Sequence, residues 1–404
     1  MHKKIIGMAC ALSMLLSGCS GFGPNVDNVS PTTFVEGLNS FNWNLLAELH
    51  IKANQFYSAY GISEALIIAA NGADGQTLEE LMNLYGMDDI QQLNEEALAL
   101  TYAVSNDGFV NANSIWIDEG LTKSDQYDDY ENTVRNYHHA TVRTVDFAGN
   151  TNQVKQDINR WVKKQTQGFI SNYQSHVSES TVTNIINAVY FKGMWEFPFD
   201  ESDTHFQNFH GLNGNRDVSM MHIFSVDVPY YETDSLKAVT LNYEDHDKSV
   251  TFITTKDEAI NVVDVWNDLP NDKKNEFLKN LDDSDASELG TIAIPSLEMD
   301  ITMNGLKKAL TELGAGTMFT SDADFSKIAD HLFVSSIEHR AKVRMNEEGT
   351  EAAAVTEIGF DTTMAPFDED EKLEFIADHP YIFVIRDTDT GVILFTGVVQ
   401  DVEQ

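Results

Sequence analysis

Two continuous apolar runs near the C-terminus constrain the fold of this chain more than any other part of it. Residues 381–385 and 392–396 are almost entirely apolar, and the short segment 387–391 between them is polar and ends in glycine. Strands that are apolar at every position are buried on both faces. A short polar connection with glycine is typical of a turn between two strands. The pattern therefore predicts a buried hairpin inside a covered sheet.

The segment just before this hairpin has more than one interpretation. It runs from Glu347 to Glu371, and it contains no basic residue from Gly349 onward. As a strand, its side chains alternate between two faces. One face carries Thr350, Ala352, Ala354, Thr356 and Ile358, and the other carries Glu351, Ala353, Val355, Glu357 and Gly359.

The flanks of this segment instead favour a loop. Gly349, Gly359, Pro366 and the acidic run 368–371 are typical of exposed, irregular backbone. We therefore predict an exposed loop that is competent to become a strand. The alternative is a short helix with Thr350 as its N-cap and the alanines propagating it.

Composition limits the partners that the chain can bind. Its 404 residues carry a formal net charge of −38, with 64 acidic against 26 Lys and Arg residues. Such a chain repels nucleic acid and anionic lipid, so neither is expected as a partner. Since 42% of the residues are hydrophobic, the chain can bury a substantial core.

The N-terminus has the pattern of an export signal. His2, Lys3 and Lys4 precede an apolar run that is too short to span a bilayer, and 16–19 read Leu-Ser-Gly-Cys. This quartet resembles the lipobox of bacterial lipoproteins. The resemblance implies a signal peptide at 1–18, a lipidated Cys19 and a flexible tether over 19–33. We expect an exported protein anchored to a membrane by lipid, on the periplasmic face or the cell surface.

Motifs for enzymatic chemistry are absent from the sequence. It contains no Gly-x-Ser-x-Gly elbow, no phosphate-binding glycine loop and no His-Glu-x-x-His pair. The acidic run 282–285 lacks calcium-loop spacing and is interpreted as a solvated turn. Cys10 leaves with the signal and Cys19 becomes the anchor, so no disulfide or cysteine nucleophile is expected. We predict no cofactor and no metal.

Periodicity outlines the secondary structure of the remaining chain. Thr77 is the expected N-cap of the helix that starts at residue 78. Helices are expected over 34–53, 64–71, from 78, 151–166 and 303–313, and strands over 108–119, 182–192 and 291–301.

Several of these segments carry family motifs. The matching stretches are 54–63, 72–77, 158–170, 187–199, 218–222, 325–328 and 339–343. Among them, 187–199 reads Asn-Ala-Val-Tyr-Phe-Lys-Gly-Met-Trp-Glu-Phe-Pro-Phe. Together they resemble the serpin family across nearly the whole chain after the tether.

The resemblance implies a fold and a set of site residues. The fold would be one α+β serpin domain over 34–404, with three β-sheets, eight to nine helices and an exposed reactive-centre loop. The cleaved bond would be Thr363-Met364. The hinge of the loop would comprise Glu347, Glu348, Gly349, Thr350, Glu351, Ala352, Ala353 and Ala354.

Further residues match the parts of serpins that let the main sheet open. Ser58, Asn187 and His339 match the shutter under the sheet, and Trp195 matches the breach where insertion begins. Ala59 and Gly61 depart from the Pro and Ser that are usual there, which bears on how easily the sheet opens.

The function implied is inhibition of a serine protease by a suicide-substrate mechanism, not catalysis. Because the loop lacks Lys and Arg, an elastase-, chymotrypsin- or subtilisin-like target is expected, and a cysteine protease is a lesser option. We expect a monomer. The alternatives are a non-inhibitory serpin that acts as a cell-surface binding protein, and an exported hydrolase.

Overall fold

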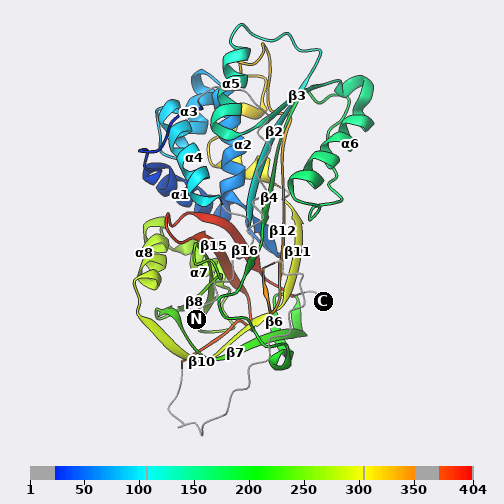
Figure 1. Ribbon diagram of the computed structural model, residues 1–404. Helices are drawn as coiled ribbons and strands as arrows, with labels where there is room; N and C mark the ends of the chain where they lie inside the picture. Colours follow the sequence, from blue (N-terminus) through cyan, green and yellow to red (C-terminus); the bar gives the residue numbers. More distant parts are fainter. Residues whose placement is uncertain (1–22, 106–107, 304, 351–372, 403–404) are drawn as a thin grey trace, which may run out of the picture.

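Helices lie on both sides of the strands, which run through the length of the structure (Figure 1). The computed structural model describes residues 23–105, 108–303, 305–350 and 373–402. Within these residues it contains nine α-helices and two short 3-10 turns (Figure 1). The helices are α1 Thr32–Glu48, α2 Ala59–Gly72, α3 Gly75–Asn83, α4 Ile90–Val104, α5 Tyr127–His138, α6 Phe147–Gln165, α7 Val262–Asp268, α8 Asn271–Asp282 and α9 Leu306–Glu312.

Sixteen strands are present in the same residues. They are β1 Gln55–Tyr57, β2 Phe109–Asp118, β3 Thr141–Val145, β4 Thr183–Phe191, β5 Gly193–Met194, β6 His205–Gly211, β7 Gly214–Glu232, β8 Leu236–Asn242, β9 Lys248–Thr255, β10 Ala286–Pro295, β11 Leu297–Thr302, β12 Ser336–Met345, β13 Gly349–Thr350, β14 Leu373–Ile376, β15 Tyr381–Asp387 and β16 Ile393–Val399.

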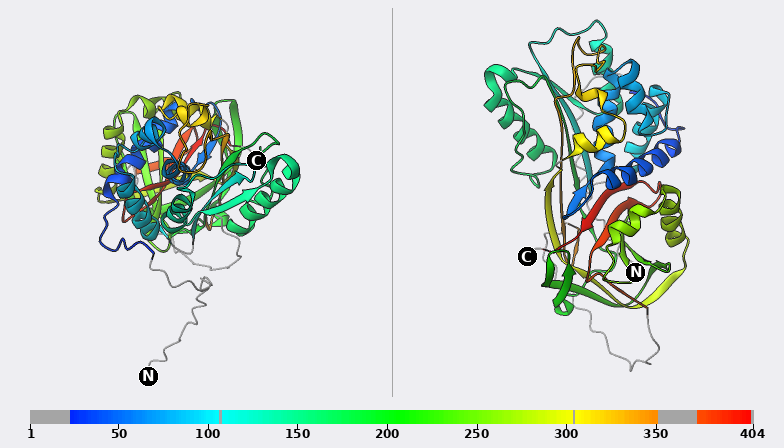
Figure 2. Two further views of the ribbon diagram at one scale, coloured as in Figure 1. Left: turned by 90° about the horizontal axis from the view of Figure 1, so that it is seen from above. Right: turned by 180° about the vertical axis from the view of Figure 1, so that it is seen from behind.

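The main sheet has seven strands and is covered on both faces. Its order is β3-β2-β4-β12-β13-β5, with β11 on the other side of β12. Helix α6 lies against one face, whereas α2 and its neighbours lie on the other (Figures 1 and 2). Strand β4 shows this burial directly, because Ile186 and Ala188 join the cluster under α6 while Ile185 and Val189 join the principal core. All nine residues of β4 are buried.

The remaining strands form two further sheets that share one strand. The pairing runs β1-β16-β15-β9-β8-β7-β10-β14, and β6 also pairs with β7. Strand β7 is 19 residues long. It pairs with β8 near its end and with β6 and β10 along the rest, so it joins the two sheets. In the described part of the chain, the α+β fold with three sheets and nine helices confirms the fold expected from the sequence.

The predicted C-terminal hairpin is present as β15 and β16. Every residue of both strands is buried. Strand β15 pairs with β9 on its other edge, and β16 pairs with β1. The hairpin is therefore flanked by paired strands on both edges.

The starts of α2 and α3 differ from the sequence-based expectation. Helix α2 begins at Ala59, because the Ser58 side chain caps it by accepting a hydrogen bond from Gly61 N at 2.9 Å. Helix α3 is capped by Asp74 and not by Thr77, so that prediction was wrong. The Thr77 hydroxyl instead accepts a hydrogen bond from the backbone N–H of Asp324 at 2.9 Å, a contact 247 residues away in the sequence.

The N-terminal part of the description starts before the first helix. Helix α1 begins at Thr32, and Val26 ahead of it is buried. The predicted signal peptide and Cys19 lie outside the described residues. Among the helices of the described residues, none is both long enough and apolar enough to cross a membrane.

Candidate functional site

The third and fourth residues of the predicted hinge form a strand inside the main sheet. Gly349 and Thr350 form β13, which pairs with β5 on one side and, through Thr350, with Met345 of β12 on the other. Thr350 is only 1% exposed, and its hydroxyl lies 2.7 Å from the hydroxyl of Tyr243. The described part of the segment for which a loop, a strand and a helix were considered thus ends in a strand, Gly349–Thr350.

Glycine is required at the first position of β13. A Cβ atom on Gly349 would lie 2.1 Å from the backbone carbonyl oxygen of Gly193 and 2.8 Å from the Cα atom of Met194. Both obstacles are backbone atoms, which cannot rotate away. The close pairing of β13 with β5 therefore depends on Gly349.

The seam between β4 and β12 is only partly closed. These two strands run parallel, and within the described residues their pairing extends from Asn184–Ser336 to Ala188–Arg340. Farther along, Thr350 lies between β12 and β5, which follows β4 in the chain, and is paired with Met345 and Gly193. Between these two levels, 189–192 on one side faces 341–344 on the other across the seam. The chain therefore enters the sheet at the point where its two central strands separate.

The turn that leads into β13 is anchored to the segment after β5. The backbone N–H of Trp195 donates to the Glu348 carbonyl at 3.0 Å, and that of Phe199 donates to the Glu347 carbonyl at 2.9 Å. The Glu347 carboxylate accepts a hydrogen bond from the Thr204 hydroxyl at 2.8 Å. The indole N–H of Trp195 donates to the Asn346 carbonyl at 2.9 Å. Glu347 and Glu348 are thus fixed mainly through backbone contacts.

An aromatic group lies beneath this turn. The rings of Trp195 and Tyr243 are stacked with centroids 4.9 Å apart, and Phe191 meets Tyr243 edge-to-face at 4.9 Å. Burial raises the pKa of Tyr243, so its hydroxyl stays protonated beside Thr350. The predicted breach residue Trp195 therefore belongs to the packed wall on which the start of the hinge rests.

The predicted shutter residues meet at the centre of the same sheet. Asn187 of β4 and His339 of β12 are directly opposite each other, and the Ser58 N–H donates to His339 Nε2 at 3.0 Å. Burial lowers the pKa of His339 to about 3. The ring is therefore neutral at ordinary pH, and Nε2 remains an acceptor.

Two asparagines that the sequence analysis missed complete this polar layer. The Asn187 side-chain amide donates to Asn111 Oδ1 at 2.6 Å and to Asn113 Oδ1 at 2.9 Å, both on β2. A signal for them exists in the sequence. The two asparagines are two residues apart in a predicted strand, so they lie on one face of it, together with the apolar residues Phe109 and Ile115. Tyr243 has no comparable signal, since its contact with Thr350 spans 107 residues.

The departures at Ala59 and Gly61 have local structural settings. Ala59 is the first residue of α2, a position that tolerates proline. A Cβ atom on Gly61 would lie 2.3 Å from Asn187 Oδ1 and 2.5 Å from a methyl group of Val189. Glycine here thus lets the Asn187 side chain pack directly against the start of α2.

Other predicted site residues cannot be placed. Glu351, Ala352, Ala353, Ala354, Thr363 and Met364 lie outside the described residues, as does Cys19. In the part of the chain that is described, no group of three or more His, Cys, Asp or Glu side chains is arranged to hold a metal ion.

Comparisons with known proteins agree on one family. A family model described as serpin (serine protease inhibitor) matches residues 36–402. A serpin-like protein of Thermococcus kodakarensis is 33% identical over 372 residues, which cover 90% of this chain and 84% of that protein. Iripin-2 of Ixodes ricinus is 30% identical over 378 residues, which cover 89% of this chain and 91% of Iripin-2. The crystal structure of tengpin, a thermophilic serpin in its native state, matches with a TM-score of 0.82 at 25% identity, covering 95% of this chain and 96% of tengpin.

Fold and site together define the class: an α+β domain in which Gly349 and Thr350 form a strand of the main sheet between β12 and β5. The chain belongs to the serpin family. Members of this family are mainly protease inhibitors and generally bind target proteases, in contrast to catalytic enzymes.

Proposed function

We propose that this chain is a suicide-substrate inhibitor of serine proteases. The target would attack the carbonyl of Thr363 and form an acyl-enzyme. The freed loop would then insert between β4 and β12, carrying the protease across the molecule before deacylation. The observation that carries this proposal is the placement of Gly349 and Thr350, which already lie in the sheet at the top of the seam.

The register of β13 supports insertion of a full strand. Thr350 is paired with Met345 and Gly193. Continued without a shift, this register puts residue 359 opposite Ser336 and residue 360 opposite Thr183, the first residues of β12 and β4. The sheet therefore has room for a strand that ends a few residues before the proposed cleavage site. The match between these lengths is what the mechanism requires.

The same register assigns the faces of the inserted strand. Thr350 faces the core, so alternation would also turn Ala352, Ala354, Thr356 and Ile358 inward. Small side chains enter a crowded sheet most easily, and Ile358 would add apolar burial. Each new hydrogen bond contributes a net of about 1 kcal/mol. A strand of roughly ten residues can thus add an amount comparable with the usual stability of a domain, roughly 5–15 kcal/mol.

The uncleaved sheet also contains groups that insertion could satisfy. Asn187 Oδ1 and His339 Nδ1 are buried in the described structure without a protein hydrogen-bond partner. An unsatisfied buried polar atom destabilises a fold by about 1–3 kcal/mol. Both atoms lie at the seam. Their missing hydrogen bonds make the closed seam less stable at this point, which favours its opening.

The chemistry of the loop bounds the target. No Lys or Arg occurs from Gly349 to Glu371. A protease that requires a basic residue just before the cleaved bond therefore has no cleavage site in this segment. Thr363 or Met364 suits an elastase-, chymotrypsin- or subtilisin-like enzyme, with papain-like cysteine proteases as a lesser option.

The direct test mixes the purified protein with elastase, chymotrypsin and subtilisin in turn. We expect an SDS-resistant complex with at least one of them, together with a C-terminal peptide that begins at Met364 and separates from the complex only under denaturing conditions. If every protease only cleaves the chain and leaves free, active enzyme, the inhibitor proposal is wrong. A non-inhibitory binding role would then be the better account.

We also propose that the protein is exported and held at a membrane by a lipid on Cys19, with residues 1–18 removed and 19–33 acting as a tether. The support is the lipobox-like sequence at residues 16–19. Cys19→Ser should move the protein from the membrane fraction to the soluble fraction in a bacterial host that modifies lipoproteins. Unchanged membrane association of this variant would contradict the proposal.

A further inference from the structure

A buried carboxyl group lies on the outer face of β12, beside the seam. The side chain of Glu338 is 6% exposed. It accepts hydrogen bonds from the Tyr173 hydroxyl at 2.9 Å, the Ser175 hydroxyl at 3.0 Å, the His176 backbone N–H at 3.2 Å and the Asn184 amide at 3.1 Å. Three of these four donors belong to one short segment that follows α6. Glu338 thus connects that segment to the main sheet.

Two more side chains of β12 hold the same segment. Arg340 donates to the Asn172 carbonyl at 2.6 Å, and the Lys342 ammonium lies 4.8 Å from the centroid of the Phe169 ring. Glu338, Arg340 and Lys342 are spaced two residues apart, so they share the outer face of the strand. Residues later in β12 contact residues earlier in the segment: Glu338 contacts Tyr173 and Ser175, whereas Lys342 contacts Phe169. Residues 169–176, called the strap below, therefore run along β12 in the opposite direction.

The strap also contacts β4, the strand on the other side of the seam. The Asn184 amide lies 3.4 Å from the Ser175 hydroxyl as well as 3.1 Å from Glu338. The Phe169 ring meets the Tyr190 ring edge-to-face at 5.2 Å. The strap thus bridges β4 and β12 over the region where a strand would have to enter.

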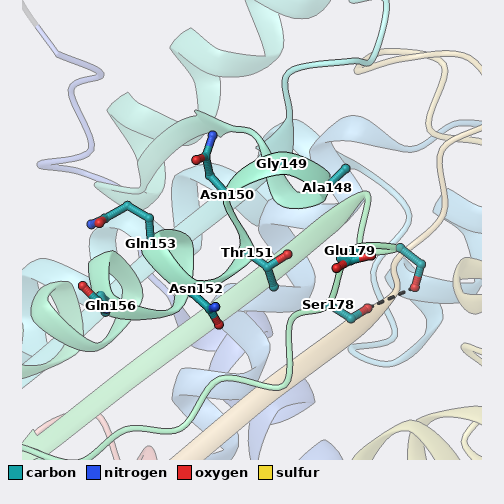
Figure 3. A pocket seen from close by; sticks show the side chains of 10 residues that line it. Ala148, Gly149, Asn150, Thr151, Asn152, Gln153, Gln156, Ser178 and Glu179 are labelled. Carbon is teal, nitrogen blue, oxygen red and sulfur yellow. Dashed lines mark hydrogen bonds between the residues drawn. The ribbon is translucent and has the colours of Figure 1, made fainter.

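Beyond the strap, the chain is separated from the start of α6. A pocket of about 870 Å³ lies between the first turns of this helix, including Asn150 and Gln153, and residues 178–180 (Figure 3). The Ser178 and Ser180 hydroxyls there bond to each other at 3.0 Å. Contacts with β12, not with the first turns of α6, are therefore what fasten the chain over the seam.

The protonation of Tyr173 suits a fastening role. Burial and the neighbouring Glu338 carboxylate raise the pKa of Tyr173 well above its ordinary value. The phenol therefore stays protonated, and its hydroxyl donates a hydrogen bond to the Glu338 carboxylate. Its backbone N–H donates to the side chain of Asn159 at 3.1 Å, which ties the strap to α6 as well.

We propose that Glu338 is a positioning residue that fastens the strap across the seam, and that release of this contact sets the rate of strand insertion between β4 and β12. The proposal rests on the loop insertion proposed above. The strap holds the two strands at their present separation until the Glu338 hydrogen bonds break. Insertion then proceeds beneath the displaced strap.

The test measures insertion without any protease. A synthetic peptide with the sequence of residues 350–362 is added to the intact protein, and the peptide-bound form is followed by native mass spectrometry. Glu338→Gln keeps the size of the side chain, but its NH2 group cannot accept the hydrogen bond from Tyr173. Losing one or two such bonds predicts insertion about tenfold faster than in the parent chain.

A second variant tests the same contact from the strap side. Tyr173→Phe removes one donor and should accelerate insertion severalfold. Because both substitutions break the same hydrogen bond, the double variant should be no faster than the product of the single effects and should fall clearly below it. If Glu338→Gln fails to fold, Tyr173→Phe alone decides the matter.

Two controls separate fastening from general destabilisation. Glu276→Gln removes an acidic side chain on α8, whose ion pair with Lys273 is exposed, and should leave the rate unchanged. Ile393→Val weakens the core in β16 without touching the seam and should lower the melting temperature without faster insertion. Equal acceleration by Ile393→Val would overturn the fastening role.

Hydrogen exchange of the uncleaved protein distinguishes failure of this inference from failure of the proposed function. Glu338→Gln should raise amide exchange in 169–176 and leave β15 and β16 unchanged. If exchange in 169–176 does not change, the inference is wrong whether or not the peptide inserts. If exchange rises but no variant accepts the peptide, loop insertion is wrong, and with it the control of its rate by Glu338.

Discussion

At the scale of single residues, the proposed loop insertion depends most on Thr350. It lies between β12 and β5, is 1% exposed and meets the Tyr243 hydroxyl. Arginine at this position would have to bury an unpaired charge, which is unfavourable by several kcal/mol. A penalty of 1.4 kcal/mol already changes a population tenfold. Insertion should therefore lose to deacylation.

We predict that Thr350→Arg converts the protein from an inhibitor into a substrate. With a protease that the parent chain traps, the yield of SDS-resistant complex should fall at least about tenfold, while cleaved protein accumulates. Thr350→Ser retains the hydroxyl and should still trap the enzyme. Efficient trapping by Thr350→Arg would show that the hinge has been assigned to the wrong residues.

His339 links the stability of the sheet to pH. Burial lowers its pKa in the folded protein to about 3, against 6.5 for an unperturbed histidine. Between these values the unfolded chain binds the extra proton and the folded chain does not. The contribution is therefore fully present above pH 6.5 and is lost as the pH falls toward 3, by up to about 1.4 kcal/mol per pH unit.

The variant His339→Gln isolates this effect from the many carboxyl groups that titrate nearby. Its side-chain oxygen can still accept the Ser58 N–H, but it does not titrate. The parent chain should lose stability relative to this variant as the pH is lowered from 6.5 to 4, as measured by urea unfolding. A difference in unfolding free energy that does not change with pH would contradict a neutral, buried His339.

At the scale of residues, local motifs identified side chains that meet in the sheet, whereas contacts between distant residues were not predicted. Matched motifs identified Ser58, Asn187 and His339, which the structure brings together. The Thr77 cap was wrong because Asp74, one turn earlier, offers its carboxylate to the first free N–H of the helix. The role of Glu338 was not found, because its donors lie more than 150 residues away.

At the scale of elements, the register of β13 predicts how an inserted strand would pair with β12. Continued from Thr350–Met345, it places Glu357 opposite Glu338 and Glu351 opposite Arg344. Directly opposite side chains share a face at short distance, so the first pair is repulsive and the second attractive.

This register yields a pair of matched variants. Glu357→Gln in the loop should stabilise the cleaved form, whereas Glu351→Gln should destabilise it, each by roughly 0.2–1 kcal/mol. Melting temperatures of the cleaved variants provide the measurement. Equal shifts for the two variants would contradict the continued register.

The C-terminal hairpin should hold the two fragments of the cleaved chain together. Strands β15 and β16 pair with each other, with β9 and with β1, and all their residues are buried. A fragment from Met364 to the C-terminus should thus remain bound after cleavage. Native mass spectrometry should show one species with the intact mass plus one water, and a denaturing gel should show two fragments. Loss of the fragment under native conditions would contradict this prediction.

At the scale of elements, sequence patterns predicted where strands lie more accurately than which strands pair with one another. The apolar runs predicted β15 and β16 because continuous burial needs no knowledge of the neighbours. The single strand expected over 291–301 is instead divided at Ser296 into β10 and β11, which belong to different sheets. The Ser296 N–H donates to the Ser219 carbonyl at this break, a contact that periodicity cannot reveal.

In the whole molecule, the seam of the main sheet is closed at one end by pairing of β4 with β12 and is open at the other, next to β13. Paired residues hold β4 and β12 together up to Ala188 and Arg340, and β13 starts the additional strand from the opposite end. Such a fold should become more stable when the loop is cut. Cutting a loop in an ordinary domain gives no such gain.

Cleavage followed by thermal unfolding and hydrogen exchange therefore tests the central claim most directly. The protein is cut once within 351–372 by a catalytic amount of protease, the protease is removed, and the cut and uncut forms are compared. We predict a higher melting temperature for the cut form and slower amide exchange over 189–192 and 341–344. An unchanged or lower melting temperature, with exchange at the seam as fast as in the uncut protein, would contradict strand insertion between β4 and β12.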